Sequence, residues 1–70
     1  MSSFQFVVPH SDKCKSIIKC IKRELAGKLR EDQKLECEKG PFGVIVRGID
    51  EEQLVHLSGI SGIFSVQYAA

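Results

Sequence analysis

The chain has 70 residues, of which 43% are hydrophobic and 27% are charged, and its formal net charge is +1 at pH 7. A chain of this length holds a single domain, over residues 1–70, with one small hydrophobic core. The composition is that of a folded globular protein and argues against intrinsic disorder. Because the net charge is close to zero, it identifies no partner by itself, and the distribution of the charges matters more.

The N-terminal segment and the cysteines indicate the compartment. The first ten residues, MSSFQFVVPH, lack the basic region and the long apolar run of a secretory signal. No window approaches the roughly 18 apolar residues of a membrane-spanning helix, so we expect no membrane contact. Cys14, Cys20 and Cys37 are odd in number, and their spacings fit neither a zinc knuckle nor a redox pair. We therefore expect reduced, partly buried thiols, no bound metal and a cytoplasmic location.

A strand followed by a long helix is predicted for the first half of the chain. Residues 4–9, FQFVVP, alternate in polarity and end at Pro9, which indicates a strand. Ser11 and Asp12 then suit a helix start, and a helix is predicted from Ser11 or Asp12 to about Glu31, with Gly27 as a weak point inside it. Its apolar face is formed by Cys14, Ile17, Ile18, Ile21, Leu25 and Leu29.

A hairpin, a short helix and a last strand are predicted for the second half. Residues 34–39 and 43–49 read as two strands joined by the turn GPFG at 40–43. Asp50 and Gln53 have the spacing of a capping box, which starts a short helix, and Gly59 is expected to end it as a left-handed C-cap. Residues 63–68, IFSVQY, alternate again and form the predicted fourth strand.

The resulting order, β-α-β-β-α-β, is typical of an α+β ferredoxin-like sandwich. In that fold two helices cover one face of a four-stranded antiparallel sheet. The first and third strands, which are the most apolar here, are expected in the centre of the sheet. The last strand is expected at an edge, beside the first.

Charge is unevenly distributed along the chain. Residues 11–31 contain seven basic and three acidic residues, whereas the remainder contains three basic and six acidic residues. A helix with one basic flank can bind a phosphate backbone. An exposed helix face is also often rich in lysine for solubility alone. The basic flank, and hence the predicted RNA-binding site, consists of Lys15, Lys19, Lys22, Arg23 and Arg30.

Other sequence features carry weaker functional signals. Lys39-Gly40 and Phe42-Gly43 echo the signature of the RNA recognition motif, but Pro41 interrupts it. The first-strand aromatics Phe4 and Phe6 are expected to pack under the helices rather than to stack on bases. Neither histidine has a nucleophile or carboxylate at a triad spacing, and no phosphate-binding loop is present. We therefore expect no catalytic residues, no cofactor and no enzymatic activity.

A family resemblance covers nearly the whole chain. The matching segments are FQFVVPHS, the helix from Lys15 to Arg30, FGVIVRGIDEEQL and ISGIFSVQYA. In this order they resemble the N-terminal ferredoxin-like domain that precedes the THUMP domain in tRNA 4-thiouridine synthetases. The resemblance implies a tRNA-binding accessory domain that helps a neighbouring module to hold the acceptor region. The chain departs from the family pattern after the first strand, where it has His10-Ser11-Asp12.

These observations predict a small RNA-binding module, with tRNA as the expected RNA, that acts with a larger parent protein or a partner subunit. The alternative is a protein-interaction or oligomerisation domain, such as a homodimer, that pairs through the uncharged edge strand SVQY. A third reading, a metal carrier that uses Cys14 and Cys20, is disfavoured because the helical projection places the two thiols on different faces.

Overall fold

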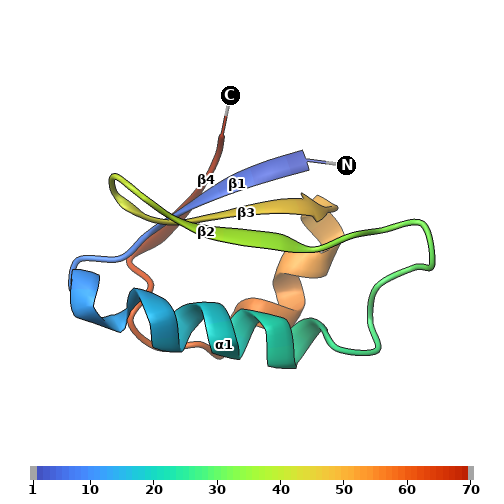
Figure 1. The fold of residues 1–70 in the computed structure, drawn as a ribbon, viewed down its shortest axis with the longest axis horizontal. Helices are drawn as coiled ribbons and strands as arrows, with labels where there is room; N and C mark the ends of the chain where they lie inside the picture. Colours follow the sequence, from blue (N-terminus) through green and yellow to red (C-terminus); the bar gives the residue numbers. More distant parts are fainter. Residues whose placement is uncertain (1, 70) are drawn as a thin grey trace.

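A computed structural model describes residues 2–69 of the chain. In chain order the elements are β1 (Ser2–Val7), the single 3-10 turn η1 (Ser11–Lys13), α1 (Cys14–Leu25), β2 (Glu36–Gly40), β3 (Gly43–Ile49), the 3-10 helix η2 (Glu51–Leu57) and β4 (Ser65–Tyr68). The longest connection, residues 26–35, links α1 to β2, and shorter segments at residues 8–10, 41–42, 50 and 58–64 link the other elements (Figure 1).

The described strands form one antiparallel sheet in the order β2-β3-β1-β4. The predicted central position of the first and third strands and the predicted edge position of the last strand are both confirmed. Helix α1 and η2 lie on the same side of this sheet (Figure 1). The described chain is thus a small α+β domain of two layers.

Alternation along the strands divides the sheet into a buried and an open face. Phe4 and Phe6 are both 1% exposed and lie under the helices, as predicted, while Gln5 between them faces the other way. Arg47 and Glu38 form an ion pair on that open face. The buried apolar core consists of Phe4, Phe6, Val8, Cys14, Ile17, Ile21, Leu25, Val44, Val46, Ile49 and Leu57.

The first helix is shorter than predicted. It ends at Leu25 rather than near Glu31, because Ala26 is extended and Gly27 adopts a left-handed φ of 77°. A left-handed glycine breaks a helix at low cost, so the chain leaves the helix just before the predicted weak point. Leu29 still packs against the core from the loop that follows.

The second helix and the last strand also differ from the prediction in detail. The predicted capping pair is present, since the Gln53 side chain accepts a hydrogen bond from the Asp50 backbone N–H (2.8 Å), but the segment is 3-10 rather than α. Gly59 does not adopt a positive φ; Gly62, with φ 93°, takes the left-handed position instead. The last strand begins at Ser65, two residues later than predicted.

Gly48 turns the end of β3 toward the core. The pairing of β1 with β3 shifts between Ser2 and Ser3, so that Gly48 is bulged out of register with φ 90°. Because Arg47 lies on the open face, simple alternation would also place Ile49 there. The bulge reverses this, and Ile49 is completely buried.

Substitution of Gly48 by alanine is expected to destabilise the fold by about 2 kcal/mol or more, because the residue would be held at a left-handed φ and its Cβ would overlap the Lys34 carbonyl oxygen. Gly59→Ala is the matched control, since nothing lies within 4 Å of a Cβ there. Urea denaturation of both variants measures the difference. Equal midpoints would contradict the bulge geometry.

Two buried glutamines join the 26–35 loop to the start of η2. The side chains of Gln33 and Gln53 are 8% and 7% exposed and exchange two amide hydrogen bonds, of 2.7 and 2.9 Å. Gln33 also donates to the Gly48 carbonyl (3.2 Å) and accepts from the Arg30 N–H (2.8 Å). Gln53 donates to the Lys28 carbonyl (3.0 Å) in addition to its capping bond. Both amides are therefore fully hydrogen-bonded.

Gln33→Met should destabilise the domain by at least about 2 kcal/mol, because it leaves two backbone groups and half of the Gln53 amide buried without partners. The exposed glutamine of β4 supplies the control, and Gln67→Met is expected to change the free energy of unfolding by less than about 0.5 kcal/mol. Thermal denaturation at micromolar protein concentration compares them. A stable Gln33→Met variant would show that the amide pair is dispensable.

Candidate nucleic-acid interface

Four of the five predicted RNA-binding residues lie together on α1. The buried face of this helix is formed by Cys14, Ile17, Ile21 and Leu25. Successive side chains are about 100° apart around the helix axis, so the residues on the side away from the core form one continuous strip along the helix. The residues in this strip, all of them exposed, are Lys15, Lys19, Lys22 and Arg23.

The structure separates Arg30 from this group. Because α1 ends at Leu25, Arg30 lies in the following loop, where its guanidinium contacts Asp50 (2.9 Å) and Asp32 (3.5 Å). The hydrogen bond with Asp50 is the main cause that raises the pKa of Arg30. The sequence projection placed Arg30 on the basic flank only because it continued the helix past Gly27. Arg30 is engaged within the domain, and the basic face is carried by α1.

Lys39 was missed by the sequence analysis. It pairs with Val44 in the β2–β3 ladder, and Val44 is buried under α1, so the Lys39 side chain lies on the helix side of the edge strand. Lys39 is exposed and follows the half-buried Cys37 by two positions. That alternation was visible in the sequence and could have indicated its side of the sheet. We define the basic face as Lys15, Lys19, Lys22, Arg23 and Lys39.

The surroundings of Cys37 show where α1 projects its lysines. Burial raises the pKa of the Cys37 thiol, and the positive charge of Lys22 opposes this shift. The charge of Lys22 therefore lies close to Cys37, on the side of β2 that faces the helix. The basic face borders this strand, at the edge of the sheet farthest from β4 in the strand order.

Four acidic side chains lie away from the basic face. Glu38 is on the open face of the sheet, where it pairs with Arg47. Three further carboxylates gather at the start of η2, where Arg30 reaches one of them. These three residues are Asp50, Glu51 and Glu52. The near-neutral chain thus has a basic helix face and an acidic corner on different elements.

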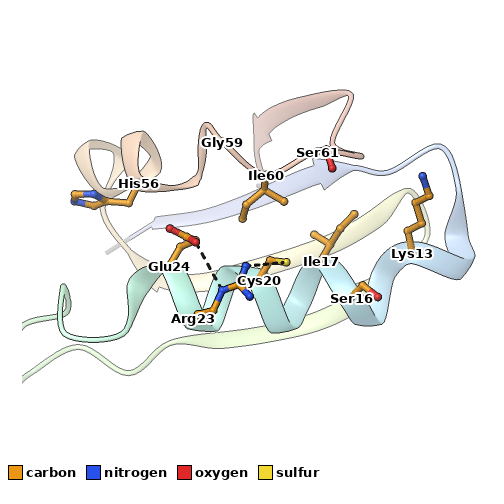
Figure 2. A pocket seen from close by; sticks show the side chains of 10 residues that line it. All are labelled: Lys13, Ser16, Ile17, Cys20, Arg23, Glu24, His56, Gly59, Ile60 and Ser61. Carbon is orange, nitrogen blue, oxygen red and sulfur yellow. Dashed lines mark hydrogen bonds and ion pairs between the residues drawn. The ribbon is translucent and has the colours of Figure 1, made fainter.

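A groove of about 490 Å³ separates α1 from residues 56–61 (Figure 2). Arg23 crosses its wall between Glu24 (3.8 Å) and the Cys20 thiol (3.7 Å). His56 lines the far end of the groove. Residues 2–69 contain no group of three histidine, cysteine or acidic side chains that could hold a metal ion. The groove presents mixed charge without a nucleophile hydrogen-bonded to a base.

The remaining sequence expectations concern thiols and membranes. All three cysteines are unpaired; Cys14 is buried, and Cys20 and Cys37 are half-buried, as predicted. Within the described residues, no helix is long and apolar enough to cross a membrane.

No protein-family model, curated protein or solved structure matches this chain. The resemblance to the THUMP-associated domain therefore stays a prediction.

Replacing Lys22 by glutamine should raise the pKa of Cys37 further, because the substitution removes the charge that stabilises its thiolate. We expect slower alkylation of Cys37 near pH 8 in a Cys20→Ser background. Lys28→Gln, in the loop, is the control and should leave the rate unchanged. An unchanged rate for Lys22→Gln would place this lysine away from β2.

Proposed function

We propose that the chain is a ferredoxin-like RNA-binding module without catalytic activity, and that it binds structured RNA, with tRNA as the expected ligand. The observation that supports this most is the basic face, where five exposed cations from α1 and β2 lie on one side of the domain. Four of them have no acid within ion-pairing distance among the described residues, and Arg23 approaches only its neighbour Glu24.

The spacing of these cations suits a phosphate backbone. Lys15, Lys19 and Lys22 span about 10 Å along α1, which corresponds to about three nucleotides along one strand of a duplex. Lysine side chains are long enough to adjust to the phosphates without a fixed geometry. Such contacts provide affinity and orientation but little sequence discrimination.

The open face of the sheet argues against recognition of single-stranded bases. The first-strand aromatics are buried under the helices, and the residues on the open face include Gln5, Ile45 and Glu38. No aromatic side chain projects from the described open-face positions, so the stacking platform of single-strand binders is missing. A folded RNA, recognised through its backbone and shape, is the ligand that fits.

The size of the basic face favours action within a larger assembly. Five phosphate contacts yield modest affinity at physiological salt, which an accessory module can add to that of a parent protein or partner subunit. The same role is implied by the resemblance to tRNA 4-thiouridine synthetases. The unpaired cysteines favour a cytoplasmic setting for it.

The double charge reversal Lys19→Glu/Lys22→Glu should lower tRNA affinity at least tenfold at low salt. A plot of the logarithm of the association constant against the logarithm of the salt concentration should have a slope of about −3 to −4 for the parent chain. For the variant the slope should be less steep by about 2. Fluorescence anisotropy with labelled tRNA measures both quantities.

Two matched variants separate local contact from total charge. Lys28→Glu/Lys34→Glu makes the same change in net charge on the loop and should reduce affinity less than threefold, and Arg30→Gln should leave it unchanged. Equal losses of tRNA affinity in both double variants would show that net charge alone explains the effect. Absence of binding at low salt, or equal binding of heparin and tRNA, would overturn the proposal.

A further inference from the structure

The β4 edge of the sheet carries a strip of exposed apolar side chains. Phe64 is 78% exposed, Val66 42% and Tyr68 63%. Val66 and Tyr68 pair with Phe6 and Phe4 of β1, so both project on the helix side of the sheet. A groove of about 290 Å³ lies beside them, lined by apolar residues that include Leu54 and Leu57 of η2. Together these side chains form one apolar surface along the edge, which we call the β4 strip.

The two edges of the sheet are protected differently. The opposite edge, β2, carries Glu36, Glu38 and Lys39 among its five residues. Charged side chains of this kind prevent unwanted pairing of an edge strand. β4, with the sequence SVQY, has no charge, proline or glycine. Of the two edges, only β4 lacks the usual protection against a further strand.

The backbone of β4 is arranged to accept such a strand. Ala69 donates its N–H to the Ser3 carbonyl (2.9 Å), so residues 65, 67 and 69 direct their backbone groups toward β1. By the alternation of an antiparallel ladder, the N–H and C=O groups of Val66 and Tyr68 point away from the sheet. Within the described chain these groups meet no further strand.

We propose that β4 pairs antiparallel with β4 of a second copy of this chain, about a two-fold axis that passes through Gln67. In this register Val66 lies opposite Tyr68 of the second copy, and the outward backbone groups of these residues exchange four hydrogen bonds across the dyad. Gln67 lies opposite its own counterpart in a non-hydrogen-bonded pair on the open face. The two sheets join into one.

The side chains suit this self-complementary register. Tyr68 is held in place by the Phe4 ring, 5.2 Å away between centroids, and by a hydrogen bond from its hydroxyl to Glu51. A prearranged aromatic at an interface loses little conformational entropy on binding. Across the dyad it covers Val66 of the second copy at the mouth of the apolar groove. The two strips become continuous.

The area fits a weak, reversible dimer. The exposed parts of Phe64, Val66 and Tyr68 amount to roughly 400 Å² per copy, so that with the strand backbone the pair buries about 1,000 Å². This is the lower limit for a specific interface, so association is expected at high protein concentration. Lys39 on β2, and Lys22 beside that strand, lie at the other end of the strand order, so a dimer leaves both copies of them accessible.

Sedimentation equilibrium tests the association. The average mass should rise from 7.8 kDa toward twice that value between about 10 µM and about 1 mM protein. Gln67→Glu and Gln67→Lys each place like charges face to face and should remain monomeric, while an equimolar mixture of the two should associate. The mixture shows that each variant is folded and that opposite charges at position 67 restore the pairing.

Cross-linking tests the register. Cα atoms of a non-hydrogen-bonded pair are about 4.5 Å apart, within the range for a disulfide. Gln67→Cys in a Cys20→Ser/Cys37→Ser background should therefore form a disulfide-linked dimer under mild oxidation. Phe42→Cys, at the exposed turn between β2 and β3, is the control and should cross-link at least tenfold more slowly.

Three results would overturn the proposal: a monomer up to about 1 mM protein, no association in the charge-swapped mixture, or equal cross-linking at positions 67 and 42. A monomer whose β4 binds a strand from a different protein also counts against it. Because β4 is uncharged, dimerisation should change little with salt, whereas RNA binding should weaken steeply. The two proposals can therefore fail independently.

Discussion

The hydrogen-bonded pair of Gln33 and Gln53 is the interaction on which the arrangement of the second half of the domain depends. A chain that leaves its first helix at Gly27 must return to the sheet through a loop, and a loop has no ladder to hydrogen-bond its backbone. The two amides supply those partners, since they bond to backbone groups of the loop, of the Gly48 bulge and of the start of η2. Polar groups are tolerated in this small core because all of them are satisfied.

The position of the 26–35 loop, which the two glutamines hold, also affects the distribution of charge. The loop brings Arg30 against Asp50, which removes one cation from the predicted site and partly neutralises the acidic corner. The remaining cations lie on α1 and on Lys39, beside the charged edge strand β2. The uncharged edge, β4, lies at the other end of the sheet, where the hydroxyl of Tyr68 donates a hydrogen bond to Glu51. Lys39 on β2 and the apolar side chains of β4 thus lie at opposite edges of the sheet.

Local patterns were sufficient for the elements whose residues alternate or repeat strongly. The buried faces of α1 and β1, the hairpin at residues 40–43 and the capping role of Gln53 all follow from spacing within a few residues. The helix end was misplaced because Leu29 continues the apolar period beyond Gly27, although it reaches the core from a loop. The bulge at Gly48 was missed because it depends on pairing with a strand 45 residues earlier in the chain.

The sequence by itself therefore determined the order of the elements, the central pair of strands and most of the core, because hydrophobic period and turn residues act locally. It also placed all five predicted cations on one helix face, and the structure keeps four of them there. Only the tertiary structure decided that Arg30 is bound to Asp50 and that Lys39 joins the basic face. The contact of Arg30 with Asp50 joins residues 20 positions apart, which no local pattern specifies. The alternation of β2 indicated the side of the sheet on which Lys39 lies, but only the pairing of β2 with β3 under α1 brings it beside the helix.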